Sequence, residues 1–572
     1  MSRIGTAAAG AIAAVGALVL TACSGDPAVS SSATSSATSP GPSTANTTDS
    51  PSRSDQLPRT VVIETDEPKQ ARSVADALAS QGLRPTSVNT AVGMVTVRSD
   101  DPALLTRVRA MDGVKGAASD REIGWSPDPL TLPTPAKTGK GDGMTGAPAS
   151  SGDPLDGWLW SMQVIEAAAA HKVTMGSPTV KVGVIDTGVD ATHPDLVANV
   201  DIEASRNWVT DDPAIDGPCE VSSCVDPVTA DGALHGTHVA GIIAASANGV
   251  GITGVAPKVT IVNDRAGQDS GLFFLGPTVN AVTYAADAKL DLVNMSFYVD
   301  PWLWTCRGGA PGDTAEQAAH QDIIIDLMDR ALDYAHDHGV TMIAALGNDG
   351  HDVAAPATDS TSPDYGGAIR QRTIDRARCF DLPVNGPHVI GVSAVGALKV
   401  KASYSNWTSK PTGGDLEVAA PGGTLDQRPD GVTGLASGLI LSTVPQASMV
   451  DDGMVAADGK VTASGAAQGM VRSCQQPPVK GAAKCGYYAM QQGTSMAAPS
   501  ATGVAALIIS KALEDTGAKP TPDQVAAKLL GTATQHGCTG AVGSGDDATC
   551  VTDGNMNGIY GAGIVNALAA VS

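Results

Sequence analysis

A chain of 572 residues exceeds the usual size of one compact domain and indicates about two to four domains. Its 36 Lys and Arg residues stand against 59 Asp and Glu residues, and the net charge of −23 argues against nucleic acid as a partner, because nucleic-acid binding needs a basic surface. The apolar content of 42% is enough for a hydrophobic core, and the acidic balance is typical of an exported protein.

The N-terminal residues 1–23 have the pattern of a secretory signal peptide. A short basic start is followed by an apolar run over residues 7–20, which is too short to span a membrane comfortably, and the segment ends in Leu20-Thr-Ala-Cys23. These four residues resemble the bacterial lipobox, in which the cysteine is lipidated and becomes the new N-terminus. We therefore expect export and a membrane anchor at Cys23. The alternative is an ordinary signal peptide with a chance cysteine.

Two linkers flank a small domain. Residues 24–59 are almost all Ser, Thr, Pro, Ala, Gly and Asp, a composition that cannot bury a core and predicts a disordered tether. Residues 125–152 are again rich in Pro, Gly, Thr and Ser and form the second linker. Between them, residues 60–124 alternate β-rich runs with helical patterns in the order βαββαβ, which predicts an α+β domain. This fold alone assigns no function.

The remaining residues, 153–572, alternate near-continuous apolar runs with helical patterns. The predicted strands include residues 180–185, 292–295, 341–345 and 389–394. Strands that are apolar on both faces and separated by helices indicate a mostly parallel sheet with helices on both sides, and therefore an α/β fold.

Three motifs in this region carry groups that suit catalysis. Asp186 directly follows a predicted strand, and catalytic groups of such sheets gather at the carboxyl ends of strands. His235 opens a helix, and a neutral imidazole can take a proton from a hydroxyl and return it. Ser495 is predicted at a helix N-terminus, which favours developing negative charge. Taken alone, Asp186 could equally be a helix cap or a metal ligand, and Ser495 an ordinary N-cap. His238, three residues after His235, is expected to be structural rather than a metal ligand.

Together these residues supply an orienting acid, a base and a nucleophile in the order Asp, His, Ser, which is the order of subtilisin. Asp186-Thr-Gly, His235-Gly-Thr-His-Val-Ala-Gly and Gly-Thr-Ser495-Met-Ala-Ala-Pro resemble the signature segments of subtilisin-family serine proteases, the subtilases. Further matching segments are residues 248–257, 344–348, 418–422 and 560–567. The resemblance covers essentially all of residues 153–572.

This resemblance implies a three-layer subtilisin-like catalytic domain at residues 153–572, preceded by a ferredoxin-like propeptide domain at residues 60–124. The propeptide of the family chaperones folding and blocks the cleft until it is removed. Asn348 matches the side-chain donor to the oxyanion, with an ordinary turn asparagine as the alternative. No cofactor is implied for catalysis. Asp195 and Asn248 match positions that bind a structural calcium in some members, although two oxygen ligands are too few to establish a site.

The sequence also departs from the family pattern. Phe297-Tyr-Val299 stand where many members have glycines that line the substrate pocket, so the pocket is expected to be narrower and its side-chain preference cannot be inferred. Extra stretches fall near residues 300–320, 351–387 and 445–487. The last is rich in Gly, Ala and Ser, and we expect it to form a mobile flap near the nucleophile.

Eight of the nine cysteines follow position 218, an even number that favours disulfides and an oxidising compartment. The near pairs Cys219/Cys224, Cys474/Cys485 and Cys538/Cys550 leave Cys306 to pair with Cys379. Eight cysteines allow 105 connectivities, and this pairing is only the most economical of them. It would crosslink the extra stretches.

The sequence therefore predicts an exported, lipid-anchored serine endopeptidase made as a zymogen. Its expected partners are polypeptide substrates, its own propeptide and, through Cys23, the membrane. The main alternative is a non-catalytic surface lipoprotein that binds peptides on an inactive protease fold, but such a copy would usually have lost one of the four residues. A serine esterase is a second alternative, although its nucleophile would normally lie in Gly-x-Ser-x-Gly, which residues 493–497 do not match.

Overall fold

The computed structural model describes residues 59–120, 152–363, 370–426, 438–474, 485–543 and 546–572. All of these fall within one unit of the chain, Ser52–Ser572. The predicted signal peptide, Cys23 and nearly all of both predicted linkers lie outside the described residues.

Residues 59–119 form the predicted small domain. Its elements are β1 (Arg59–Thr65), α1 (Ala71–Ser80), β2 (Pro85–Asn89), β3 (Met94–Ser99), α2 (Leu104–Arg109) and β4 (Val114–Ser119). The antiparallel sheet has the strand order β2-β3-β1-β4, which is ferredoxin-like and confirms the predicted order of elements. Because side chains alternate along a strand, Val61 and Ile63 pack against α1 and α2, whereas Val62 packs with residues of the larger domain.

The larger domain is built on the predicted parallel sheet. Its strands are β5 (Lys181–Ile185), β6 (Arg206–Asn207), β7 (Thr260–Arg265), β8 (Leu292–Met295), β10 (Thr341–Ala345), β14 (Val389–Val395) and β15 (Val418–Pro421). Their order is β15-β14-β10-β8-β5-β7-β6, and all neighbours run parallel. The predicted strands of the sequence are therefore confirmed, and the sheet is buried along its central strands.

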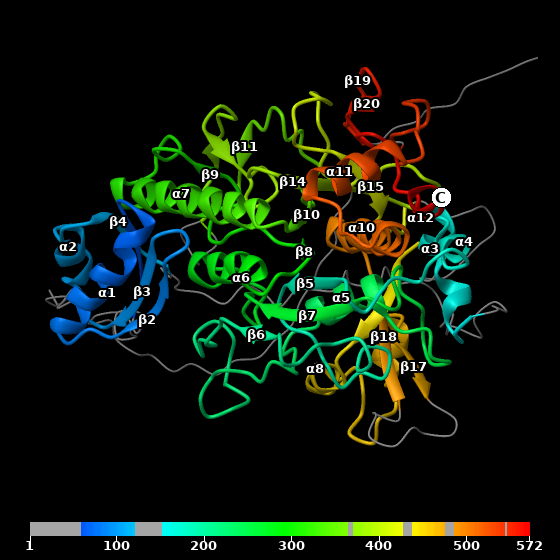
Figure 1. Ribbon diagram of the computed structural model, residues 1–572, viewed down its shortest axis with the longest axis horizontal. Coiled ribbons are helices and arrows are strands. Elements are labelled where there is room, and N and C mark those ends of the chain that lie inside the picture. Colours follow the sequence, from blue (N-terminus) through cyan, green and yellow to red (C-terminus); the bar gives the residue numbers. More distant parts are fainter. Residues whose placement is uncertain (1–58, 121–151, 364–369, 427–437, 475–484, 544–545) are drawn as a thin grey trace, which may run out of the picture. The chain divides into compact units, whose positions relative to one another are not determined.

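Helices cover both faces of this sheet (Figure 1). On one face lie α6 (Leu275–Asp287) and α7 (Ala315–Asp337), and on the other lie α5 (His235–Ala244), α10 (Thr494–Thr516), α11 (Pro522–Gly531) and α12 (Ala567–Val571). Within β10, Met342 packs with the first group and Ile343 with the second. The arrangement is the three-layer α/β fold that the sequence predicts.

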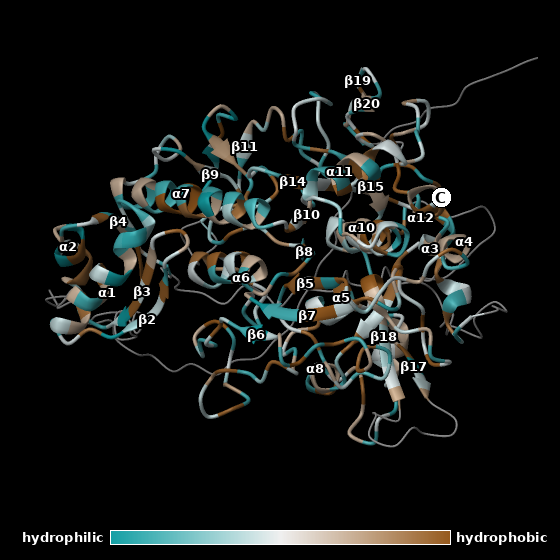
Figure 2. Ribbon diagram, in the orientation of Figure 1, coloured by the Kyte–Doolittle hydropathy of each residue, from teal (hydrophilic) through white to brown (hydrophobic). Residues whose placement is uncertain are grey.

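Neighbouring strands of the sheet differ in hydropathy, as Figure 2 shows. The strand β5 is coloured as apolar, whereas β7 ends in hydrophilic colours at Asn263, Asp264 and Arg265, which are nevertheless fully buried. The helix α10 is long and apolar enough to cross a membrane by length and composition alone, but 83% of its most apolar window is buried inside the protein. It is therefore a core helix of the larger domain.

The described residues of the predicted flap at 445–487 have regular secondary structure, and the mobility of this segment stays a prediction. They form α8 (Gln446–Asp451), α9 (Ala463–Ala467) and β17 (Val471–Cys474), and β17 joins β18 (Cys485–Gln491) and β16 (Ile440–Val444) in the sheet order β16-β18-β17. A small core of Val444, Met449, Val455, Met470 and Tyr487 holds these elements together. A few spaced apolar residues are enough to give a small core to a segment that is otherwise rich in Gly, Ala and Ser.

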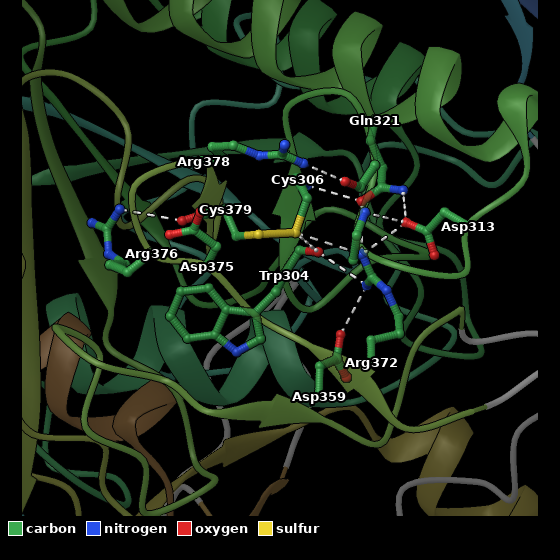
Figure 3. Close-up of a disulfide and its surroundings, with 12 residues drawn as sticks. Trp304, Cys306, Asp313, Gln321, Asp359, Arg372, Asp375, Arg376, Arg378 and Cys379 are labelled. Carbon is green, nitrogen blue, oxygen red and sulfur yellow. Dashed lines mark hydrogen bonds and ion pairs between the residues drawn. A yellow bond between two sulfur atoms is a disulfide. The ribbon is translucent and has the colours of Figure 1, made fainter.

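All four proposed disulfides are present: Cys219–Cys224, Cys306–Cys379, Cys474–Cys485 and Cys538–Cys550. The bond between Cys306 and Cys379 joins the short paired strands β9 (Thr305–Cys306) and β13 (Cys379–Phe380), one from each of two extra stretches (Figure 3). Smaller elements complete the fold, namely α3 (Trp160–Val164), α4 (Ala167–Ala170), β11 (Thr358–Asp359), β12 (Arg372–Thr373), β19 (Thr552–Asp553) and β20 (Met556–Asn557).

Next to this disulfide, the buried guanidinium of Arg372 holds the two stretches together (Figure 3). It forms an ion pair with Asp359 at 2.9 Å and donates to the Trp304 carbonyl at 3.0 Å and to Gln321 Oε1 at 2.8 Å. A buried charge needs such partners, because desolvation otherwise opposes burial. The extra stretches are thus fixed to the body of the domain by both covalent and ionic contacts.

Candidate active site

The predicted catalytic residues come from the ends of neighbouring elements. Asp186 follows β5, and Asn348 lies three residues after the end of β10, two strands away in the sheet. His235 is the first residue of α5, and Ser495 is the second residue of α10. Residues that are far apart in the sequence are therefore collected at the carboxyl end of the parallel sheet, where ligands of such folds bind.

Asp186 and His235 are joined by a hydrogen bond. His235 Nδ1 lies 2.8 Å from Asp186 Oδ1, which also accepts the backbone N–H of Thr187 at 2.8 Å. The carboxylate is fully buried. Since an ionised carboxylate only accepts hydrogen bonds, Nδ1 carries the proton and Nε2 keeps a free lone pair. The imidazole therefore has the tautomer that a general base requires.

Opposing effects act on the pKa of His235. Burial lowers it, whereas the charge of Asp186 and the hydrogen bond to it raise it, and the net result is a pKa above the ordinary value of 6.5. Catalysis by this base needs the neutral imidazole. We therefore expect kcat/KM to be highest above the His235 pKa and to fall as the pH drops through it, with the acidic limb above pH 6.5. A pH–rate profile on a neutral peptide measures this limb, and a midpoint at or below pH 6 would contradict the geometry.

Ser495 does not contact His235 directly. Its hydroxyl donates to the Ser296 carbonyl oxygen at 3.3 Å, and within the described part of the chain no hydrogen bond joins it to the imidazole. Both residues nevertheless line the same pocket, which has a volume of about 270 Å³. Catalytic hydrogen bonds are often loose without substrate and tighten in the complex. A rotation of the hydroxyl from Ser296 toward Nε2 would complete the relay.

Asn348 is fixed beside Ser495 through its carbonyl oxygen. Oδ1 accepts the Thr494 N–H at 2.9 Å and the Thr494 hydroxyl at 2.9 Å, which leaves Nδ2 as a donor on a residue that lines the pocket. The Ser495 N–H lies in the first turn of α10, where backbone N–H groups have no intrahelical partner. The two groups are suited to bind an oxyanion.

Replacing Asn348 with alanine removes one of these donors and keeps the nucleophile and the base. We expect kcat to fall by about 10²–10³-fold with little change in KM, because the lost interaction forms only in the transition state. Steady-state kinetics on one peptide would measure both parameters. An unchanged kcat, or an effect on KM alone, would show that Asn348 only stabilises the turn in which it lies and does not bind the oxyanion.

Several supporting residues carry no signal that we recognised in the sequence. Asp231 is buried, accepts the Thr187 hydroxyl at 3.0 Å, and accepts the Thr237 N–H and hydroxyl at 2.9 and 2.6 Å. It thus connects the segment after Asp186 to the first turn of α5, and burial raises its pKa to about 6. A glycine is required at position 236, where α5 begins close to the segment after Asp186, because a Cβ on Gly236 would lie 2.1 Å from the Gly188 oxygen.

His238 has a structural role, as predicted. It is fully buried, its Nε2 lies 3.2 Å from the Ala489 carbonyl oxygen, and burial lowers its pKa to about 3. It therefore stays neutral and connects α5 to β18. Within the described ranges, the one group of acidic, histidine or cysteine side chains spaced to hold a metal does not include it.

Comparison with known proteins agrees with this geometry. Residues 177–563 match the sequence model of the subtilase family, which covers more than half of the chain and includes all three motifs. The chain belongs to the subtilase family. Subtilases are serine endopeptidases and need no cofactor for catalysis.

Curated subtilases resemble the chain across the catalytic domain. Subtilisin from Bacillus pumilus is 27% identical over 386 residues, which cover 68% of this chain and 95% of the relative. Subtilisin E from Bacillus subtilis (strain 168) is also 27% identical over 386 residues, which cover 68% of each chain. The solved structure of the epidermin leader peptide processing serine protease (EpiP) from Staphylococcus aureus has a TM-score of 0.57 at 19% identity, covers 90% of this chain and 98% of its own, and supports the fold.

Subtilases often bind structural calcium, and Asp195 and Asn248 leave few oxygens free for such a site. Asp195 Oδ2 accepts the Ile252 N–H at 3.0 Å and the Tyr488 hydroxyl at 2.8 Å, and burial raises the Asp195 pKa to about 8. Asn248 Oδ1 accepts the Val250 N–H at 2.9 Å. Asp195 Oδ2 and Asn248 Oδ1 are therefore already used by N–H and O–H donors, whereas Asp195 Oδ1 is buried without a hydrogen-bond partner among the described residues. The raised pKa of Asp195 favours a neutral acid.

A different acidic group has the donor set that calcium prefers. One carboxylate oxygen each from Asp211, Glu220, Asp226 and Asp269 lies within 4.8 Å of the others. The buried Arg265 pairs with Asp211 and Asp226 at 2.7 Å and with Asp269 at 3.0 Å. The second oxygens of these three aspartates are buried without a hydrogen-bond partner among the described residues. Burial also raises the pKa of Asp269 to about 8 and that of Asp211 to about 6, and the guanidinium of Arg265 already neutralises part of this cluster, so the spacing of the oxygens alone favours a cation here.

Proposed function

We propose that this subtilase cleaves peptide bonds with Asp186, His235 and Ser495 as its catalytic triad. The observation that carries the proposal is the hydrogen bond between His235 Nδ1 and the buried Asp186, on an imidazole that lines one pocket with Ser495 and Asn348. Base, nucleophile and oxyanion donor thus line one space that a substrate can enter, and the acid orients the base through its hydrogen bond.

In this mechanism the Ser495 hydroxyl gives its proton to His235 Nε2 and attacks the peptide carbonyl. The negative charge that develops on the carbonyl oxygen is bound by the Ser495 N–H and by Asn348 Nδ2. His235 then protonates the leaving amine, the C–N bond breaks, and the acyl group remains on Ser495 as the acyl-enzyme. Water attacks the ester with His235 again as the base, and Ser495 is restored.

We further propose that the enzyme is made as a zymogen and that residues 60–124 are its propeptide. Contacts between the small domain and the catalytic domain support this proposal. The Asp120 carboxylate accepts the N–H groups of Leu275 and Gly276 at 3.1 and 3.0 Å, in the first turn of α6, where a negative charge is favourable. Glu64 pairs with Arg330 of α7 at 2.7 Å.

Export and lipid anchoring remain a proposal that rests on residues 1–23. The variant Cys23→Ser is expected to leave the membrane fraction or to retain its signal peptide, because the thiol that accepts the lipid is lost. One acyl chain binds a membrane only marginally, so stable anchoring needs more than one chain. Fractionation followed by immunoblotting would test this, and unchanged membrane retention with normal processing would contradict it.

The two alternative functions can be separated with the purified, matured protein. A peptidase hydrolyses an internally quenched peptide, whereas an esterase hydrolyses simple esters and leaves the peptide intact. An inactive peptide-binding lipoprotein would hydrolyse neither. Hydrolysis of the peptide by the wild type, absent from Ser495→Ala, would support the proposed triad.

A further inference from the structure

The pocket beside Ser495 is unusually acidic. Three aspartates, Asp300, Asp349 and Asp381, line it together with apolar side chains. Polar groups that line a mostly apolar pocket fix the identity and the orientation of the group that enters it. These carboxylates lie outside the catalytic relay, and the proposed mechanism leaves them without a role.

Asp381 is the most conspicuous of them. Its side chain is almost fully buried, with 3% of the residue exposed. Among the residues that the structure describes, none donates a hydrogen bond to its carboxylate and none forms an ion pair with it. Burial, reinforced by the nearby Asp349 carboxylate, raises the pKa of Asp381 well above its usual range. The raised pKa favours the neutral acid in the free enzyme, and a cation that enters the pocket would pair with the charged carboxylate, which the described residues leave without a partner.

The nearest cation does not meet this need. Arg376 is close enough to lower the Asp381 pKa, but its guanidinium pairs with Asp415 and donates to the Val353 and Cys379 carbonyls at 3.1 and 3.2 Å. The other charged neighbours of Asp381 are carboxylates and cannot pair with it.

Asp359 already pairs with Arg372 at 2.9 Å, and Asp349 adds a second negative charge on the exposed side of the pocket. The pocket is therefore lined by more carboxyl groups than the described cations pair with.

The position of Asp381 relates it to the reacting bond. A Cβ built on Gly347 would lie 3.5 Å from Asp381 Oδ2, so the carboxylate reaches the backbone just before Asn348. The substrate carbonyl must lie between Ser495 Oγ and the oxyanion donors. The side chain of that same substrate residue is therefore the one that enters this pocket and approaches Asp381.

Asp381 is also firmly held. It follows β13 directly, and β13 is attached to β9 by strand pairing and by the disulfide between Cys379 and Cys306 (Figure 3). The Asp381 N–H donates to Asn385 Oδ1 at 2.9 Å, and the Asn385 N–H donates to the Asp381 carbonyl at 2.7 Å. A carboxyl group fixed in this way needs little reorganisation when a substrate binds.

The walls of the pocket suit a long side chain with an apolar stem. Phe273 and Phe297 stack with their ring centroids 4.1 Å apart, and both line the pocket with Leu272 and Leu303. Lysine and arginine combine an apolar stem, which such walls can cover, with a cationic end.

We propose that this pocket selects lysine or arginine as the substrate residue on the N-terminal side of the cleaved bond, with the cation bound by Asp381 and supported by Asp349. The inference rests on the proposed peptidase function and names its substrate class. The same preference for lysine or arginine should govern removal of the propeptide. The stretch from residue 121 to residue 152 contains three basic residues, Arg121, Lys137 and Lys140, and self-cleavage is expected after one of them.

The test uses matured enzyme and four peptides that differ only at this position, which is Lys, Arg, Gln or Phe. We expect kcat/KM for the Lys and Arg peptides to exceed that for Gln by about 10²-fold or more, because glutamine has a similar length without the charge. In Asp381→Asn this ratio should fall at least tenfold, while the Gln and Phe peptides change by no more than a few-fold.

A matched control is Asp375→Asn, which removes the same charge from an exposed position on the same segment and should leave every ratio unchanged. If Asp381→Asn fails to fold, Asp349→Asn replaces it, because Asp349 is exposed, and the Lys-to-Gln ratio should still fall. Equal rates for Lys, Gln and Phe in the wild type would overturn the inference and leave the peptidase function intact. A protein that cleaves no peptide and does not react with a fluorophosphonate would overturn the proposed function, and the inference with it.

Discussion

Ser495→Ala should leave the protein as an uncut precursor. The substitution deletes only the nucleophilic oxygen, whose one hydrogen bond in the structure is the contact of 3.3 Å to the Ser296 carbonyl, so folding should be preserved. Loss of the nucleophile in this type of triad lowers kcat by about 10⁶-fold. If the propeptide is removed by the enzyme itself, no cleavage between about residue 119 and residue 152 should be detected. His235→Ala should give the same precursor, because the hydroxyl is a weak nucleophile without its base.

An immunoblot of these variants beside the wild type, in a host that lacks other secreted proteases, measures this outcome. Ser500→Ala is a matched control, since Ser500 lies on the same helix and its hydroxyl makes only a contact of 3.4 Å to the Met496 carbonyl. It should mature normally. Maturation of Ser495→Ala at the wild-type rate would show that another enzyme cuts the chain, and the zymogen proposal would fail.

Asp186→Asn should lower kcat by about 10⁴-fold while the fold is retained. The asparagine amide can donate a hydrogen bond to His235 Nδ1, and the imidazole then carries its proton on Nε2, where it cannot accept the Ser495 hydroxyl. The effect arises from the tautomer, because the volume of the side chain hardly changes.

Single-turnover kinetics on one peptide would measure this loss. Asp190→Asn is the control, because Asp190 lies on the same loop and its Oδ1 accepts from Thr192, a contact that asparagine can keep. The control should retain nearly full activity. If Asp186→Asn kept more than a tenth of the wild-type rate, Asp186 would not be the orienting acid of His235.

The sequence predicted the parts of the fold whose physical signal is local. Apolar runs at β5, β8, β10 and β14 indicate strands that are buried on both faces. Asp186 can be recognised in the sequence because it directly follows such a strand. The helix at His235 and the helix at Ser495 also follow from local patterns. What the sequence could not give is the orientation of the Ser495 hydroxyl, which depends on the Ser296 carbonyl from another strand.

Other features depend on contacts between segments that are distant in the chain. Asp381 lies in an extra stretch without any recognisable motif, and only the fold brings it to the pocket that Ser495 lines. The bulky residues Phe297 and Tyr298 were expected to narrow this pocket. Both residues line it, Phe297 stacks on Phe273 as part of the wall, and the pocket has a volume of about 270 Å³.

The central claim is that Ser495 is a nucleophile activated by His235, and covalent labelling tests it most directly. Purified, matured protein is treated with a fluorophosphonate, and the modified peptide is identified by mass spectrometry. Our account predicts one adduct, on Ser495, in the wild type, and no adduct in His235→Ala or in heat-denatured protein. A properly folded, matured protein that takes up no label, or takes it up on a different serine, would contradict the account.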